Sequence, residues 1–271
     1  MKISIITVVR NGEDTIRDTI NCVLSQSYHN IEYIVVDGNS TDGTMDIIQS
    51  FGNRISKVIS EPDTGIYDAM NKGLRAATGD YIGFLNADDF YSNQDVVSQI
   101  VSTGRETQAD SIYGDLVFVD QKDTNKVVRY WKSGRFDRFK MIFGWSVPHP
   151  TFFVKRSVFK RHGLFRENFG LSGDYEMMVR FFFKDRISAA YIPQILVRMR
   201  VGGAGNSGFK SKMKGNREDI QAWKQNGLKI PFLTILMKPL RKLPQFIMRP
   251  ALDVLPAPTP TYEVQQSPST I

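Results

Sequence analysis

The first 90 residues of this 271-residue chain alternate short apolar runs with segments of helical periodicity. The runs are rich in β-branched residues and lie at residues 2–9, 31–36, 55–60 and 79–85. Between the first two runs, Ile16, Ile20, Val23 and Leu24 recur at the spacing of one helix face. This alternation predicts an α/β fold with a mostly parallel central sheet, right-handed crossovers and helices on both faces.

Polar residues follow each of these runs. Asn11, Asp37, Asp63 and Asp88 come shortly after the four expected strands. Ligands of such sheets bind beyond the carboxyl ends of the strands, so these side chains are expected at one binding edge. The last run ends at residues 85–89 (LNADD), whose carboxylates suit a divalent cation. The same aspartates could instead cap the helix that follows, because Asp is a preferred N-cap residue.

Charge divides the chain into an acidic and a basic part, although the net charge is +7. Residues 1–100 carry 7 Lys and Arg against 14 Asp and Glu, whereas residues 101–271 carry 28 against 14. The acidic part suits a cation, and the basic part suits nucleic acid, membrane or a phosphorylated substrate; charge alone does not choose among them. The single cysteine, Cys22, excludes an internal disulfide and favours a reducing, cytoplasmic location.

The pattern changes after Asp89. Residues 94–103, 157–162 and 174–184 are expected to be helical, and strands are expected at the following ranges: 111–120, 126–131, 151–155 and 192–200. This part reads as an extension of the sheet, so one domain is expected over residues 1–208.

A basic helical extension is expected over residues 209–255, followed by a disordered tail at residues 256–271. Within it, residues 230–249 interleave apolar and basic side chains and contain no acid. Pro239 and Pro244 limit this stretch to two short amphipathic helices. They are expected to lie on an anionic membrane surface; packing back on the domain of residues 1–208 is the alternative.

Five blocks appear in a fixed order: residues 4–7 (SIIT), 37–44 (DGNSTDGT), 63–73 (DTGIYDAMNKG), 77–81 (ATGDY) and 85–89 (LNADD). Together they resemble the family 2 glycosyltransferases, which have the Rossmann-like GT-A fold. The similarity covers roughly residues 1–205 and is strongest to bacterial enzymes that build exopolysaccharide, capsule or lipopolysaccharide. It implies transfer of a sugar, with inversion, from a nucleotide-diphospho-sugar, here expected to be a UDP-sugar, to a hydroxyl of a lipid-linked or cell-surface glycan.

The resemblance also implies that residues 1–208 are a catalytic domain, in which residues 1–100 bind the nucleotide-sugar donor and residues 101–208 form the acceptor side. Asp37 would accept a hydrogen bond from the nucleotide base, with Thr7 and Asn11 in the same pocket. Asp63 would lie near the nucleotide, and Lys72 would face either the phosphates or solvent.

Asn86-x-Asp88 corresponds to the metal motif of the family, with Mn²⁺ or Mg²⁺ as the expected cofactor. Asn86 replaces the commoner first aspartate, so Asp88 becomes the principal ligand and loss of metal dependence stays open. Asp89 would contact the donor sugar or serve the structure. Arg198 or Arg200 would approach the diphosphate.

On the acceptor side, the resemblance implies that Asp174 is the base that takes the acceptor proton, with Glu176 as the second candidate. A helix N-terminus would keep the Asp174 carboxylate ionised. Trp145 and His149 would lie beside the acceptor, where an indole can stack on a sugar face.

Two other functions compete with this reading. A sugar-phosphate nucleotidyltransferase would need a basic, glycine-rich loop after the first strand, which residues 10–14 (RNGED) do not supply. A non-catalytic basic protein that binds membrane or nucleic acid would leave the acidic motifs unexplained. The expected partners are therefore a nucleotide-sugar, a glycan acceptor and the inner face of the membrane, and no nucleic acid.

Overall fold

The computed structural model describes residues 1–202, 208–229, 234, 237–238, 240–241 and 244–247. In this part of the chain, nine strands form one sheet in the order β3-β2-β1-β4-β8-β6-β9-β5, with β7 paired to β6. The predicted tail at residues 256–271 and most of the glycine-rich stretch after β9 lie outside the described residues.

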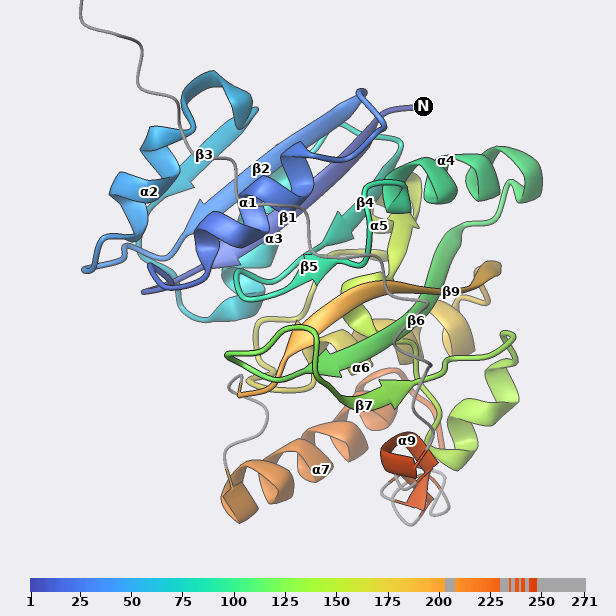
Figure 1. Ribbon diagram of the computed structural model, residues 1–271. Coiled ribbons are helices and arrows are strands. Elements are labelled where there is room, and N and C mark those ends of the chain that lie inside the picture. The colour runs from blue at the N-terminus through green and yellow to red at the C-terminus, as the bar shows by residue number, and fades with distance from the viewer. Residues whose placement is uncertain (203–207, 230–233, 235–236, 239, 242–243, 248–271) are drawn as a thin grey trace, which may run out of the picture.

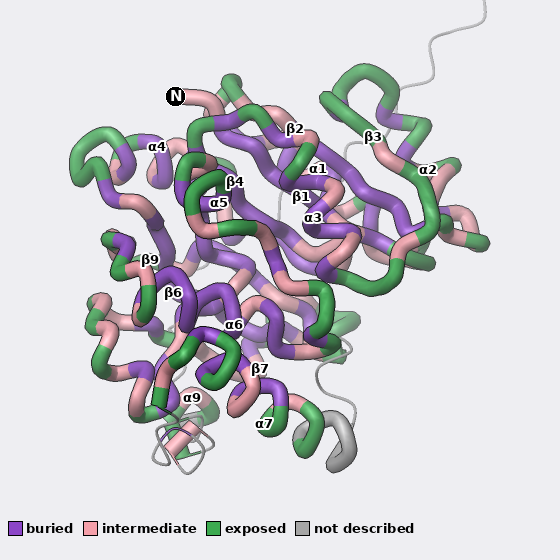
Figure 2. The backbone as a smooth tube through the Cα atoms, turned by 180° about the vertical axis from the view of Figure 1, so that it is seen from behind, coloured by how far each residue is buried: buried purple, intermediate pink, exposed green. Residues whose placement is uncertain are grey.

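The N-terminal strands are β1 (Ile3–Val9), β2 (Ile31–Asp37), β3 (Lys57–Ser60) and β4 (Tyr81–Phe84). All three pairings among them are parallel, which confirms the sheet predicted from the alternating pattern. β1 and β2 are almost wholly buried, as the purple tube of Figure 2 shows, because helices cover both of their faces. β3 is the exposed edge of the sheet.

The second half of the chain extends this sheet with mixed pairings. Its strands are β5 (Phe90–Tyr91), β6 (Ser111–Val119), β7 (Val127–Trp131), β8 (Phe153–Lys155) and β9 (Ala189–Arg200). β8 runs antiparallel to both β4 and β6, and so joins the two halves. β9 is parallel to β6, whereas β7 is antiparallel to it. The complete sheet is therefore mixed, and only its first half is entirely parallel.

Helices pack on both faces of the sheet and enclose two apolar clusters. One cluster includes side chains of α1 (Ile16–Leu24), α2 (Thr44–Ser50) and α4 (Val96–Thr107). The other includes side chains of α3 (Ile66–Ala76), α5 (Arg156–His162) and α6 (Gly173–Met178). The helical periodicity of the sequence thus reflects helices that each bury one apolar stripe against the sheet.

Short helical turns complete the described fold. They are the 3₁₀ turns Gly52–Arg54, Arg138–Phe143 and His149–Thr151, and a π-helical turn, Val179–Lys184, that continues α6. The last two 3₁₀ turns lie in the stretch between β7 and β8, where no helix was predicted.

The C-terminal part contributes α7 (Gly208–Gln225) and α9 (Pro244–Ile247). Figure 1 shows α7 and α9 on the same side of the molecule as β7, and α9 packs against β7. Trp223 of α7 is 1% exposed and belongs to the same apolar cluster as α6. Among the described residues, no helix has the length and apolar character needed to cross a bilayer.

Candidate active site

A cleft of about 1140 Å³ opens at the carboxyl ends of β1 and β4. Its lining comes from distant parts of the chain and includes six of the predicted site residues: Asn11, Asn86, Asp88, Trp145, His149 and Asp174. The topology explains why Asn11, Asn86 and Asp88 meet there, since parallel strands deliver their following loops to one edge. Five predicted residues, namely Thr7, Asp37, Asp63, Lys72 and Asp89, lie outside this lining, as does Glu176.

Asp88 is the carboxylate that follows β4 in the cleft. Burial raises the pKa of Asp88, and the nearby charge of Arg200 opposes that rise. Arg200 does not bind the carboxylate itself: its guanidinium donates to the Asp88 carbonyl oxygen at 2.9 Å and to Asp18 Oδ2 at 2.7 Å. A partly desolvated carboxylate that no described side chain neutralises directly is suited to a cation.

Asp89 has a different environment from its neighbour. It is fully buried and accepts hydrogen bonds from Asn86 Nδ2 at 2.7 Å and from the Arg200 backbone at 3.3 Å. Burial, followed by repulsion from Asp88, raises the pKa of Asp89 well above its ordinary value. Asn86 is therefore oriented by Asp89, which ties the loop after β4 to the end of β9.

The other predicted donor residues stabilise loops at the same edge. Asp37 is fully buried and accepts hydrogen bonds from Ser40 and from Ser60 Oγ, the latter at 2.7 Å. Asn11 Oδ1 accepts a hydrogen bond from the Thr41 backbone at 2.9 Å. These contacts hold the loop after β2 against the loop after β1.

Thr7, Asp63 and Lys72 also have protein partners. Thr7 is fully buried, and its hydroxyl oxygen accepts a hydrogen bond from Tyr33 at 3.1 Å. The carboxylate of Asp63 lies so close to Gly38 that a side chain at position 38 would collide with it. Lys72 donates to the Pro62 carbonyl at 2.6 Å and forms ion pairs with Glu61 and Asp68, so its ammonium is already paired.

Asp174 lies in the first turn of α6 and lines the cleft. Tyr67 of α3 donates a hydrogen bond from its hydroxyl to Asp174 Oδ1 at 3.4 Å. The ring of Tyr67 packs directly on Gly173, where an added Cβ would lie 2.7 Å from a ring carbon. Tyr67 was not among the predicted site residues, although it lies within the DTGIYDAMNKG block; a glycine before Asp174 was the sequence signal for this close packing.

His149 lies between aromatic rings in the cleft lining. Its ring stacks on Phe84 with centroids 5.4 Å apart and meets Phe165 edge-on at 5.8 Å. Burial lowers the pKa of His149, with an opposing effect from Asp174, so the imidazole is neutral at pH 7. Its Nε2 is buried and has no hydrogen-bond partner among the described residues, which leaves that nitrogen available to a ligand hydroxyl.

Trp145 is 5% exposed, and its indole N–H donates to the Ser133 carbonyl at 2.8 Å. It packs edge-on against Tyr113 and Phe136. Trp145 therefore contributes to the cleft wall as part of the core.

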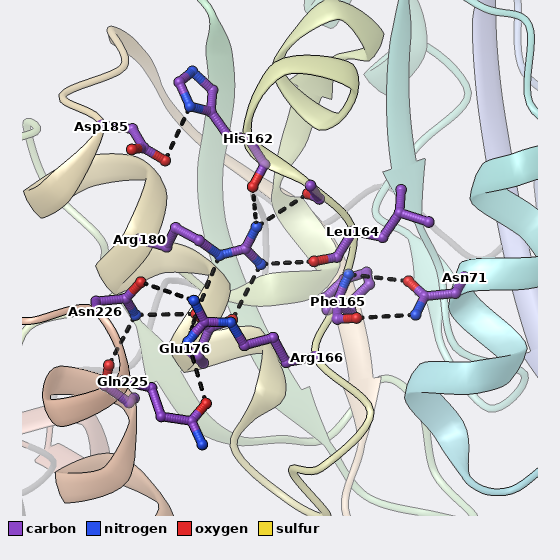
Figure 3. Close-up of polar contacts among 12 residues, drawn as sticks. Asn71, His162, Leu164, Phe165, Arg166, Glu176, Arg180, Asp185, Gln225 and Asn226 are labelled. Carbon is purple, nitrogen blue, oxygen red and sulfur yellow. Dashed lines mark hydrogen bonds and ion pairs between the residues drawn. The ribbon is translucent and has the colours of Figure 1, made fainter.

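Glu176 is fully buried and does not line the cleft. Figure 3 shows the ion-pair network in which it lies. Arg180 donates to both of its oxygens, each at 3.1 Å, and Asn226 donates to Oε1 at 3.0 Å. Arg180 also donates to backbone carbonyls of residues 162–164, and Arg166 lies 3.3 Å from Glu176. The network joins α6 and the π-helical turn that continues it to Asn226, directly after α7, and to the end of α5 and the segment that follows it, so Glu176 has a structural environment.

The C-terminal segment also reaches the cleft. Lys238, Arg241, Pro244 and Gln245 are part of its lining. The described residues of the stretch 230–249 thus pack on the catalytic domain, which was the alternative to the expected membrane contact. Its remaining residues lie outside the described part of the chain.

Comparison with known proteins agrees with this geometry. A family model described as Glycosyl transferase family 2 matches residues 4–164, more than half of the chain. The chain belongs to this family. The match covers β1 to α5, and so includes the loops that carry Asn11 and Asp88 as well as His149.

Curated relatives of this family 2 glycosyltransferase are themselves glycosyltransferases. A PGL/p-HBAD biosynthesis glycosyltransferase of Mycobacterium bovis is 27% identical over 209 residues, covering 75% of this chain and 79% of the relative. An uncharacterised glycosyltransferase of Rickettsia typhi is 31% identical over 209 residues, covering 74% of this chain and 64% of the relative.

Solved structures confirm the GT-A fold. A fragment of S. aureus TarS in complex with UDP-GlcNAc matches with a TM-score of 0.65 at 18% identity, covering 83% of this chain and 65% of the fragment. The mannosyltransferase PcManGT from Pyrobaculum calidifontis, in complex with GDP-Man and Mn²⁺, matches with a TM-score of 0.62 at 18% identity. The match covers 88% of this chain and 68% of the PcManGT chain. The family 2 chain spans 43% of a longer TarS chain.

Proposed function

We propose that this family 2 glycosyltransferase transfers a sugar from a UDP-sugar to an acceptor hydroxyl with inversion at the anomeric carbon. The observation that carries the proposal is that Asp88, after β4, and Asp174, at the start of α6, line one cleft although 86 positions separate them in the sequence. Direct displacement needs one group for the leaving diphosphate and another for the acceptor proton, and these two carboxylates meet that need.

On the acceptor side, Asp174 takes the proton from the attacking hydroxyl. The Tyr67 hydroxyl donates to Asp174 Oδ1 and orients the carboxylate, leaving Oδ2 for the acceptor. His149 lies in the same lining, and its buried Nε2 can hydrogen-bond a hydroxyl of the bound sugar. Aromatic packing of His149 on Phe84 fixes the ring before substrate binds.

On the donor side, the residues fit a divalent cation that takes most of its ligands from the substrate. No group of three or more His, Cys, Asp or Glu able to hold a metal occurs among the described residues. Asp88 supplies one desolvated carboxylate, Asn86 supplies an amide oxygen, and diphosphate and water oxygens would complete the shell. When bound, Mn²⁺ or Mg²⁺ would neutralise charge that develops on the leaving diphosphate. The Mn²⁺ complex of PcManGT supports this assignment.

The donor preference is tested by thermal shift and slow donor hydrolysis with a panel of nucleotide-sugars, with and without Mn²⁺. The proposal expects UDP-sugars to bind in preference to GDP-sugars, as the UDP-GlcNAc complex of TarS suggests. Asp174→Asn should lower kcat by at least about a hundredfold while leaving UDP affinity unchanged, because it removes the base and keeps the shape. Wild-type turnover in this variant would refute the role of Asp174.

We also propose a cytoplasmic location and a glycan acceptor presented at the inner face of the membrane. The basic composition of residues 230–249 supports this, and their described part still leaves Leu240 and Phe246 about half exposed, at 49% and 52%. Co-sedimentation with anionic vesicles tests it: a double Leu240→Ser, Phe246→Ser variant should bind less than wild type. Equal binding of the two proteins would contradict the membrane contact.

A further inference from the structure

The wall of the cleft that β7 and the C-terminal segment contribute is basic, whereas Asn86 and Asp88 lie on the loop after β4. Arg129 of β7, Lys132 directly after β7, and Lys238 and Arg241 of the C-terminal segment all line this wall. Figure 1 shows that α9 and β7 lie side by side although more than 100 residues separate them, and the two elements are in contact. Tertiary packing therefore gathers four cations that the sequence distributes over two regions.

Arg129 is the most constrained of these cations. Its guanidinium lies over the Phe118 ring at 4.2 Å, and its Nε donates to Gln245 Oε1 at 2.7 Å. Burial lowers the pKa of Arg129 to about 10. No carboxylate in the described part of the chain lies within ion-pairing distance of it. A guanidinium that is held by aromatic packing, belongs to a cleft lining and has no carboxylate partner is suited to bind an anion.

The neighbouring cations differ in whether they already have an ion-pair partner. Lys238 is already paired with Asp219 at 2.5 Å and lies 4.2 Å from the centre of the Tyr175 ring. It shapes the wall, because its backbone packs on Gly144, where an added Cβ would lie 2.6 Å from Lys238 Cα. Lys132 and Arg241 are exposed, and among the described residues neither forms an ion pair. Three cations of this wall are thus available to a ligand.

We propose that Arg129, with Lys132 and Arg241, forms a subsite for a phosphate group carried by the acceptor. The inference rests on the proposed function, and it names the acceptor class: a glycan or lipid that bears a phosphoryl group. The donor diphosphate belongs at the other wall, where Asn86 and Asp88 follow β4. Asp174 lines the same cleft, so a phosphate at Arg129 would hold the acceptor beside the base.

Binding of n-octyl phosphate to the wild-type chain tests the subsite, measured by titration calorimetry with saturating UDP so that the diphosphate site is filled. Octyl glucoside is the neutral counterpart, and glycerol 3-phosphate is the counterpart without a lipid tail. We expect n-octyl phosphate to bind, octyl glucoside not to bind, and the affinity to fall as salt rises. If glycerol 3-phosphate binds as tightly as n-octyl phosphate, the natural ligand is a soluble phosphate. If it binds more weakly, the natural ligand is a lipid phosphate. No binding of either phosphate would overturn the proposal.

Substitutions assign the effect to the guanidinium. Arg129→Gln should weaken n-octyl phosphate binding by roughly 10-fold or more, the loss expected for a charge-assisted hydrogen bond. Lys132→Gln and Arg241→Gln alter exposed side chains and should each weaken it by about threefold. Arg105→Gln is the matched control, because Arg105 is an exposed arginine of α4 outside the cleft.

Two results would overturn the assignment. Gln245→Ala keeps the guanidinium but removes its hydrogen bond to α9. If this variant weakens phosphate binding as much as Arg129→Gln does, the effect comes from docking of α9. If Arg129→Gln weakens UDP binding, Arg129 serves the donor instead. A different result would refute the proposed function. If the wild-type chain binds n-octyl phosphate but no nucleotide-sugar, the anion subsite is supported and the proposed glycosyl transfer is refuted.

Discussion

Helix α6 carries two carboxylates: Asp174, proposed as the base, and Glu176, which we expect to stabilise the fold. The substitution Glu176→Gln tests the structural role of Glu176. Its side chain is 0% exposed, and its ion-pair partner Arg180 is 6% exposed. Removing the charge leaves the Arg180 guanidinium buried without a counter-ion, which typically costs about 3–5 kcal/mol of unfolding free energy. Arg180 keeps its hydrogen bonds to the carbonyls of residues 162–164, and glutamine keeps one acceptor, so the lower end, about 3 kcal/mol, is expected.

Urea unfolding followed by tryptophan fluorescence measures this loss, because Trp223 packs in the same region. Arg166→Gln is the control: Arg166 lies 3.3 Å from Glu176 but is 30% exposed, so about 1 kcal/mol or less is expected. A Glu176→Gln protein as stable as wild type would refute the network argument. A folded Glu176→Gln protein with strongly reduced kcat would return Glu176 to the catalytic candidates.

Three further predictions concern the cleft and the sheet. Asp88→Ala should reduce turnover by at least about a hundredfold and abolish any stimulation by Mn²⁺, as measured by donor consumption. Gly173→Ala should cost about 1–3 kcal/mol and lower kcat, because the new methyl group would displace the Tyr67 ring that orients Asp174; normal turnover would contradict this. Burial would raise the pKa of Glu32, but hydrogen bonds from Lys2, Ser4 and Thr78 outweigh it and hold the value at about 2, below the ordinary 4.5. Glu32→Gln should therefore destabilise the protein above pH 4.5, and the difference from wild type should vanish as the pH falls to about 2 in acid unfolding.

Local pattern was enough for the first half of the fold. The β-branched runs and the helical spacing of Ile16 and Ile20 predicted β1 to β4 and their parallel direction, because burial of a sheet on both faces leaves a direct trace in the sequence. The pairing of β8 between β4 and β6 was not predictable in the same way. β8 has three residues, and so short a strand has no periodicity that could specify its neighbours.

Parallel topology also allowed part of the site to be predicted. Asn11 and Asp88 follow strands of a parallel sheet, so topology alone brings them to the cleft. Asp37 follows such a strand too, yet its carboxylate is turned inward by Ser40 and Ser60. Hydrogen-bond partners decide where a side chain points, and a strand pattern does not contain them.

The sequence by itself determined the family motifs, the alternating elements of the first half and the two carboxylates expected in the cleft. Only the tertiary structure decided that Tyr67 orients Asp174, that Glu176 is an internal ion pair and that Arg129 meets α9 to form a basic wall. These contacts join residues 107, 4 and 116 positions apart, and only the middle one lies within one helical stretch. Periodicity reports which face of an element is buried, whereas long-range partners follow from how the elements pack.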